Sequence, residues 1–285
     1  GTLNFAANEN SKTITITAKH FVLAGGAINS PGVLLRSSVP NPYLTLGTRT
    51  FLHPVTIMTA LMDQKVEGWS GAPQSVYSDQ FLWNNPHGIG YKLEVPPEQP
   101  MLMSSAHTGF GLAHSQWMSQ LAYQHTQIAL LVDGFDERST GGRVILRKDG
   151  SPVLEYPISD YVWDGARRSF HTMAELIFAV GAQQVRALHN DATTWTSLAQ
   201  AKEGIDDLVY KPLRAWMSSA HQMGGCKLGE DERNSVVDSE GTHHQLRNLS
   251  VIDGSVFPTS IGANPQVSIY GMSLKNAFAL GKRLG

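Results

Sequence analysis

The chain has 285 residues, of which 41% are hydrophobic and 16% charged, a balance typical of folded globular proteins rather than disordered ones. Its formal net charge is −2 at pH 7, and no run of five like charges occurs, so nothing in the charge pattern suggests a nucleic-acid partner. Cys226 is the only cysteine, which excludes an internal disulfide, a cysteine-based zinc motif and a CxxC redox pair.

The amino-terminal sequence shows no targeting or membrane segment. GTLNFAANEN lacks the basic start and apolar core of a signal peptide, and no stretch approaches 18 consecutive apolar residues. We therefore expect a cytoplasmic protein, with a periplasmic location or peripheral membrane association as open alternatives. The chain begins without Met and runs quickly into strand-like sequence, which we interpret as a chain cut from something longer.

The first predicted elements follow one another closely. Residues 12–18 alternate polar and apolar side chains, as a half-buried strand does. Residues 20–24 form an apolar run that ends at a Gly-Gly pair, which predicts a buried strand and a tight turn. Residues 29–31, Asn-Ser-Pro, predict a helix start with the proline in its first turn. Strand, glycine turn and helix are typical of a nucleotide-binding α/β unit.

The middle of the chain, from about residue 49 to residue 157, has a different pattern. Short apolar or alternating runs separated by turn-rich stretches predict an antiparallel sheet with long insertions; they are residues 55–61, 90–95, 128–132 and 144–146. Apolar residues at three- and four-residue steps predict a helix over 164–180, with Gly181 as its stop. Further on, the pattern predicts a buried strand over 248–254 and a helix over 266–280.

Two motifs in the last third could carry chemistry. His221 precedes Gly224 and Gly225, which would let backbone come close to a flat ligand beside the imidazole. Asp253 stands at a predicted strand end, and Asn264 comes just before a predicted helix, in an N-cap-like position where free amides attract negative charge. Each also has a purely structural interpretation: a buried, satisfied histidine, an aspartate that caps a turn, an asparagine that caps a helix.

The chain contains 11 histidines, which raises the question of a metal site. His243 and His244 are adjacent, so their side chains point apart in a strand or loop, and no His-x-x-x-His or His-x-His pairing with a carboxylate occurs. We therefore predict no metal site.

The two motifs lie about 40 residues apart, and in this order they resemble the glucose-methanol-choline (GMC) FAD-dependent oxidoreductases. The similarity is greatest to the branch of cholesterol oxidases and long-chain fatty alcohol oxidases. The residues that carry it are 219–226 (SAHQMGGC), 235–238 (SVVD), 249–259 (LSVIDGSVFPT), 262–265 (GANP) and 26–35 (GAINSPGVLL). One departure is Ser37-Ser38, where the family pattern usually closes with Ser-Gly.

The resemblance implies an α/β (α+β) fold with two domains. Residues 1–48 and 216–285 would form a partial FAD-binding Rossmann-like domain, and residues 49–215 a substrate domain with a mainly antiparallel sheet flanked by helices. The sequence contains no G-x-G-x-x-G, the motif that binds the FAD pyrophosphate near the family's amino terminus. We therefore expect a missing amino-terminal FAD-binding segment as a partner.

The resemblance also implies the chemistry. His221 would accept the hydroxyl proton of an alcohol, and Asn264 would hydrogen-bond the same oxygen. Contacts to FAD would come from Gly26, Ala27, Asp253, Gly254, Ala263, Pro265 and Gln266. The substrate would be a large apolar alcohol, and the electrons would pass to oxygen or another acceptor. A dehydrogenase that uses another acceptor instead of oxygen, and a truncated, non-catalytic fragment or binding module, stay open as alternatives.

Overall fold

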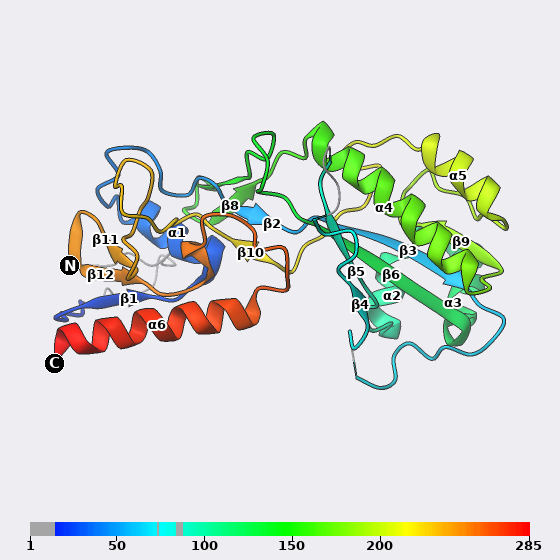
Figure 1. Cartoon of the computed structure of the whole chain (residues 1–285), viewed down its shortest axis with the longest axis horizontal. Coiled ribbons are helices and arrows are strands. Elements are labelled where there is room, and N and C mark those ends of the chain that lie inside the picture. The colour runs from blue at the N-terminus through cyan, green and yellow to red at the C-terminus, as the bar shows by residue number, and fades with distance from the viewer. Residues whose placement is uncertain (1–14, 73, 84–87) are drawn as a thin grey trace. The chain divides into compact units, whose positions relative to one another are not determined.

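A computed structural model describes residues 15–72, 74–83 and 88–285, which form two compact units (Figure 1). Unit 1 comprises the residues up to His53, Asp133–Pro157 and Ala220–Gly285, and unit 2 comprises Pro54–Val132 and Ile158–Ser219. This division departs from the expected domain boundaries, because residues 133–157 belong to unit 1. The reason is the hairpin of β7 (Arg143–Leu146) and β8 (Pro152–Glu155), which packs so closely on Gly32 that a Cβ there would lie 2.8 Å from Pro152.

Unit 1 contains a three-stranded sheet in the order β1-β12-β11. Strand β1 (Phe21–Leu23) runs parallel to β12 (Leu246–Val251), and β11 (Thr242–His243) pairs antiparallel on the other side. Both predicted strands are thus present and lie side by side, although more than 200 residues separate them. The predicted burial holds for the end of β12 but is wrong for β1, in which no residue is buried and Val22 is 47% exposed. The expected strand over 12–18 is not confirmed: residues 15–18 are not in a strand, and the rest lie outside the described residues.

Helix α1 (Gly26–Arg36) begins earlier than the sequence predicted. The Asn-Ser-Pro pattern placed the start at 29–31, but Pro31 lies inside the helix. The start is fixed instead by a distant contact, because the Gly26 amide and the Ser30 hydroxyl both donate to the Asp253 carboxylate. A tertiary hydrogen bond therefore overrides the local signal for a helix start.

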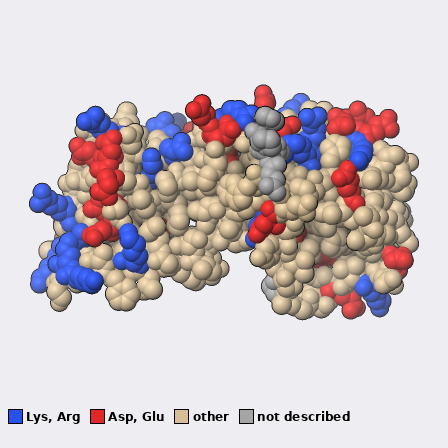
Figure 2. Space-filling model, viewed as in Figure 1, with Lys and Arg blue, Asp and Glu red and all other residues tan. Residues whose placement is uncertain are grey.

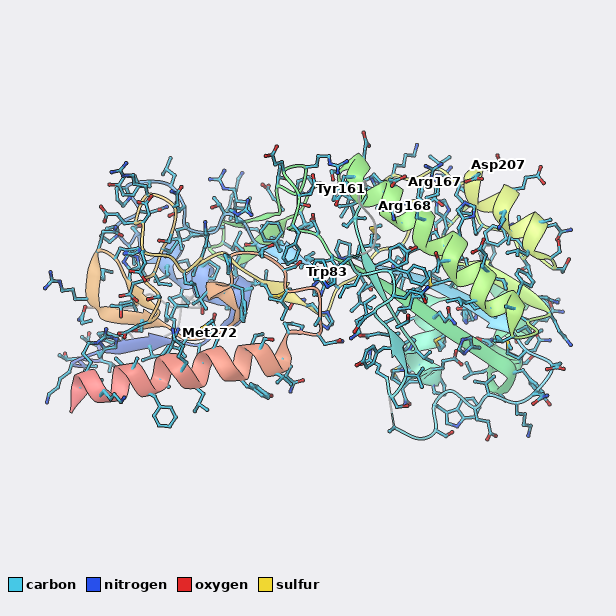
Figure 3. The ribbon with its side chains drawn as sticks, viewed as in Figure 1. Trp83, Tyr161, Arg167, Arg168, Asp207 and Met272 are labelled. Atoms are coloured by element: carbon cyan, nitrogen blue, oxygen red, sulfur yellow. The ribbon has the colours of Figure 1, made fainter. Side chains whose placement is uncertain are left out.

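Helix α6 (Gln266–Leu284) begins at the predicted residue and runs four residues further than predicted. Met272 of α6 is on the side of the helix that faces β1 and packs on the core of unit 1 (Figure 3). Asn276 and Leu280 are the buried residues of the helix. Lys282 and Arg283 stand in its last turn, where basic side chains gather on the surface (Figure 2) and interact favourably with the helix dipole.

Unit 2 is built on an antiparallel sheet, as predicted, and the sheet has five strands. The predicted run at 144–146 is not one of them, because it forms β7 in unit 1. The strand order of the sheet is β4 (Tyr77–Ser78), β5 (Tyr91–Glu94), β6 (Gln124–Leu131), β3 (Val55–Leu61) and β9 (Gln184–Ala187). Helix α4 (Asp160–Ala179) covers one face and buries Phe170, Met173 and Ile177 against it. It begins four residues before the predicted 164, because its first turn contributes Val162 and Trp163 to the same core.

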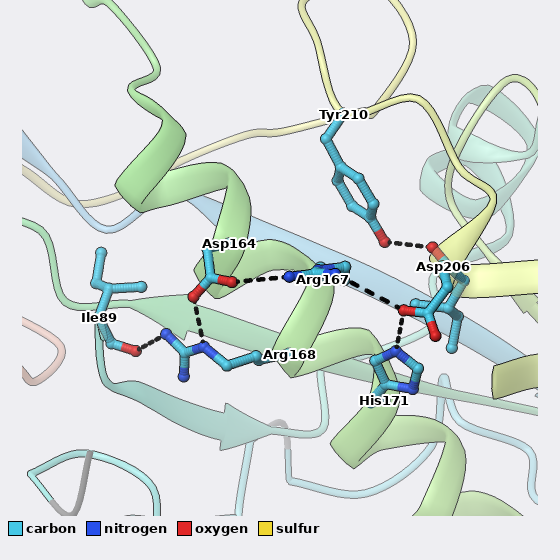
Figure 4. A network of polar contacts seen from close by, with 8 residues as sticks. Ile89, Asp164, Arg167, Arg168, His171, Asp206 and Tyr210 are labelled. Carbon is cyan, nitrogen blue, oxygen red and sulfur yellow. Dashed lines mark hydrogen bonds and ion pairs between the residues drawn. The ribbon is translucent and has the colours of Figure 1, made fainter. Parts of the chain in front are cut away.

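Smaller helices complete unit 2: α2 (Pro100–Ala106), α3 (Gly111–Ser119) and α5 (Leu198–Asp206). A polar network joins α4 to α5, in which Asp164 pairs with Arg167 and Arg168 while Asp206 bonds His171 (Figure 4). These charges are largely accessible to water, so each pair contributes little to stability, on the order of 0–1 kcal/mol. Within the described part of the chain, no helix has the length and apolarity to cross a bilayer.

Candidate active site

His221 lies just before β10 (Gln222–Met223), in unit 1. Strand β10 pairs antiparallel with β2 (Phe51–Leu52), with Gln222 opposite Leu52, and this register sets His221 opposite His53. The two Nδ1 atoms are 3.1 Å apart and the rings are nearly perpendicular, at 88°. His53 is 1% exposed, whereas His221 is half-buried. The His221 imidazole is thus held by His53 at Nδ1 and is partly exposed.

His53 is a site residue that the sequence did not point to. It is 168 positions from His221, and each strand of the pairing that joins them is only two residues long. Such short strands have no periodicity to detect. The one local sign is that a histidine-proline step follows an apolar pair.

The glycines after His221 serve the protein's own packing. Gly224 and Gly225 have φ angles of 84° and 97°, which favour glycine. A Cβ at Gly224 would lie 2.2 Å from the carbonyl oxygen of Arg49, and one at Gly225 would lie 3.1 Å from Pro31 Cγ. The close approach is therefore to the backbone before β2 and to α1. Contact with a ligand at these glycines stays a prediction.

Asp253 is a buried carboxylate of unit 1 that accepts three hydrogen bonds. One carboxylate oxygen accepts hydrogen bonds from the Gly26 amide at 2.9 Å and the Ser30 hydroxyl at 2.5 Å. The other accepts from the Ser255 amide at 2.7 Å, and the residue is only 8% exposed. The structure thus brings the predicted residues Gly26 and Asp253 together, with the carboxylate already bonded by three donors of the chain itself.

The same turn connects Asp253 to His221 and to α6. Its 3-10 helix, η2 (Gly254–Val256), accepts hydrogen bonds from Gly224 at 3.1 Å and Cys226 at 2.9 Å. Ile269 of α6 lies over Gly254, where a Cβ would be 2.9 Å from its side chain. One backbone framework therefore carries the His221 strand, the Asp253 turn and the first turns of α6.

Asn264 is half-buried in the segment before α6, and Ala263 beside it is exposed. The N-cap of α6 is Pro265, so the prediction that Asn264 occupies the cap is wrong by one residue. The cap shifts because the Pro265 carbonyl accepts the first intrahelical bond, from Ile269 at 2.8 Å. Gln266 and the two residues after it are exposed, so the positive end of the helix dipole faces solvent.

The thiol of Cys226, inside the His221 motif, is fully buried, and burial raises its pKa well above the ordinary value. It stays protonated and unreactive at neutral pH. Within residues 15–72, 74–83 and 88–285, no group of three or more His, Cys, Asp or Glu side chains is arranged to hold a metal ion. The site offers an imidazole, an amide and helix amides as its polar groups.

These features fit one end of a flavin cofactor. Gly26 has no atom within 4 Å of the position of a Cβ, which leaves open space at the start of α1. The exposed first turn of α6 presents amides that suit an anionic ring edge. The pyrophosphate anchor, G-x-G-x-x-G, is not in the sequence.

Comparison with known proteins agrees with this assignment. Family models described as GMC oxidoreductase match residues 2–55 and residues 138–273. An uncharacterized GMC-type oxidoreductase of Mycobacterium tuberculosis is 27% identical over 94% of this chain and 41% of its own length. Long-chain-alcohol oxidase FAO3 of Arabidopsis thaliana is 23% identical over 96% of this chain and 37% of its own length. A formate oxidase variant of Aspergillus oryzae has a TM-score of 0.63 at 16% identity, over 93% of this chain and 55% of that structure.

The fold and the two matched regions define the chain as part of a flavoprotein oxidoreductase. It belongs to the GMC oxidoreductase family, whose members are FAD-binding enzymes. The chain spans about two fifths of the length of the curated relatives that it matches, with 41% of one and 37% of another covered.

Proposed function

We propose that the protein containing this chain oxidises an alcohol to an aldehyde or ketone, with His221 as the base and Asn264 as the second hydrogen-bond partner of the alcohol oxygen. The observation that carries the proposal is the half-buried imidazole of His221, fixed by the buried His53 on the framework that also supports the start of α6.

The proposed residues divide the chemistry between them. FAD, when bound, takes up the hydride from the alcohol carbon. His221 accepts the hydroxyl proton, since a neutral imidazole titrates near working pH. The Asn264 amide donates a hydrogen bond to the alkoxide without competing for its proton. The residues proposed to contact FAD are Gly26, Ala27, Asp253, Gly254, Ala263, Pro265 and Gln266.

We propose a large apolar alcohol as the substrate. The long-chain-alcohol oxidases of Arabidopsis among the relatives support this class. Either oxygen or another acceptor would then reoxidise the flavin. We also propose that an amino-terminal FAD-binding segment outside this chain anchors the pyrophosphate, since the sequence lacks that motif.

Rapid reduction of the flavin tests the proposal in FAD-loaded enzyme that includes these 285 residues. Long-chain primary alcohols and sterols are mixed anaerobically with enzyme, and the loss of flavin absorbance at about 450 nm is followed over time. We expect His221→Ala to slow reduction by about 10²- to 10⁴-fold with FAD still bound. His244→Ala is the matched control, because its ring bonds Ser235 and should leave the rate unchanged. Reduction at the normal rate in His221→Ala would refute the assignment, and a protein that binds no FAD would favour the non-catalytic module.

Reoxidation separates the two acceptor classes. Reduced enzyme is mixed with oxygen or with an artificial acceptor, and return of the flavin band is timed. Fast return with oxygen supports an oxidase, whereas return only with the artificial acceptor supports a dehydrogenase.

A further inference from the structure

We propose that the helices α2 and α3 of unit 2 dock on the surface of a lipid bilayer, from which the protein takes its apolar alcohol. The side chains that enter the lipid, the apolar tip, are Met101, Leu102, Phe110 and Leu112, which are 85%, 52%, 91% and 74% exposed. The inference rests on the proposed substrate class, because a large apolar alcohol dissolves in lipid far better than in water.

The backbone presents Phe110 at the apex of a turn between the two helices. Gly109 and Gly111 on either side of it have φ angles of 105° and 63°, which favour glycine. Phe110 itself is extended, with a φ of −152°. The chain therefore bends on both sides of the aromatic ring, which leaves this large apolar side chain almost wholly in solvent.

Hydrogen bonds hold the hairpin of α2 and α3 together and fix it to the sheet (Figure 1). His114 Nε2 donates to the Ser104 carbonyl at 2.8 Å, and the Trp117 indole donates to His107 Nε2 at 2.7 Å. The side-chain amide of Gln124, at the start of β6, donates to the Trp117 carbonyl at 2.6 Å. These polar groups bond within unit 2, so the hairpin can present its apolar tip as a fixed surface.

The charge pattern favours lipid as the partner of the apolar tip. Residues 99–123 contain no Lys, Arg, Asp or Glu, although charged residues make up 16% of the chain. A charged side chain is costly to place in hydrocarbon, and this segment brings none with it. Protein interfaces, by contrast, are enriched in Arg, Tyr and Trp and carry hydrogen bonds between the partners. The apolar tip consists of Met, Leu and Phe alone.

The packing of α3 (Gly111–Ser119) points the same way. All nine of its residues are described, and none of them is buried. A helix this short depends on the burial of an apolar face for its stability. Lipid around Phe110 and Leu112 would supply burial that unit 2 does not.

Flotation of the 285-residue chain with phosphatidylcholine vesicles tests the inference without flavin or substrate. We expect binding that added salt does not weaken, because no charge takes part. Phe110→Ser should weaken it about ten- to a hundredfold, the loss expected when a large apolar side chain leaves lipid. Leu213→Ser is the matched control and should leave binding unchanged, because Leu213 is 90% exposed in the same unit but lies in a basic stretch with Lys211 and Arg214. Tryptophan-monitored urea unfolding should be the same for both variants, since both side chains are exposed.

A spin label reports whether the tip itself enters the lipid. Cys226 is the only cysteine and is fully buried, so a nitroxide attaches only to a cysteine placed on the surface. On vesicles, the label in Phe110→Cys should gain contact with dissolved oxygen and lose contact with a water-soluble nickel complex. The label in Leu213→Cys should stay accessible to the nickel complex.

Failure of the unmodified chain to bind, binding that salt abolishes, or equal loss in Leu213→Ser would overturn the inference. A label in Phe110→Cys that stays in water on bound vesicles would also overturn it and would assign the surface to a protein partner. In FAD-loaded enzyme, Phe110→Ser should slow flavin reduction by a long-chain alcohol carried in vesicles about ten- to a hundredfold, and leave reduction by a water-soluble shorter alcohol unchanged. Equal slowing with both would contradict docking. Vesicle binding is measured without turnover, so its failure can be told apart from a failed proposal of alcohol oxidation.

Discussion

Replacing Asp253 with alanine should destabilise unit 1 more than any change on its surface. The substitution removes the acceptor of three hydrogen bonds, from Gly26, Ser30 and Ser255. A hydrogen bond to a charged group contributes roughly 1.5–3 kcal/mol, and the three share one carboxylate, so they are not additive. The Ser255 amide is deeply buried and would be left without water or partner. We therefore expect a loss of about 4 kcal/mol, and about half of that for Asp253→Asn, which keeps one oxygen.

The assay must report on unit 1 itself. All six tryptophans lie in unit 2, so fluorescence follows only that unit; they are Trp69, Trp83, Trp117, Trp163, Trp195 and Trp216. Amide hydrogen exchange at Gly26 and Ser255 reports on unit 1, and about 4 kcal/mol corresponds to exchange roughly a thousandfold faster. Asp149→Ala is the control, because it removes an exposed carboxylate of unit 1 that bonds only Ser151 nearby. Unchanged exchange at Ser255 in Asp253→Ala would show that the carboxylate does not hold the turn.

Three further changes follow from the backbone and from buried titratable groups. Gly224→Ala should lower the free energy of unfolding by several kcal/mol in thermal denaturation, because the new Cβ would lie 2.2 Å from the Arg49 carbonyl oxygen. Gly271→Ala, which has open space in α6, should instead raise that free energy by about 0.5–1 kcal/mol. Equal effects of the two substitutions would contradict this packing. Burial raises the pKa of Glu98 to about 7. The protonated Glu98 side chain therefore contributes its full stabilisation below pH 4.5, the ordinary pKa, and this stabilisation is lost as the pH rises through 7. Glu98→Gln should remove that loss, about 3 kcal/mol, from tryptophan-monitored urea unfolding at pH 8; an identical pH profile in the variant would refute it. Burial, and then the nearby His244 charge, lowers the pKa of His243 to about 4, so stability is full above 6.5 and lost as pH falls toward 4. His243→Asn should flatten that acid limb in hydrogen exchange of unit 1, and a limb as steep as before would argue against His243 as its source.

Long periodic segments could be read from the sequence because their signal is local. The helices at 160–179 and 266–284 and the strands β3, β5 and β6 of unit 2 were each predicted within a few residues of their limits, whereas β4 and β9 were not predicted. A face that must be buried repeats its apolar residues at the period of the element, whatever it packs against. The glycine and asparagine motifs likewise identified the family, since they are contiguous in the chain.

Features set by distant contacts could not be read in the same way. The start of α1 depends on Asp253, 227 residues away, and the partner of His221 comes from a two-residue strand 168 positions earlier. The hairpin over 143–155 joined unit 1, although its sequence is an ordinary strand and turn. By itself, the sequence determined the elements and named His221 and Asn264 as a candidate pair. Only the tertiary structure decided which donors Asp253 accepts and which ring faces His221, because a hydrogen bond between remote segments leaves no pattern in either one.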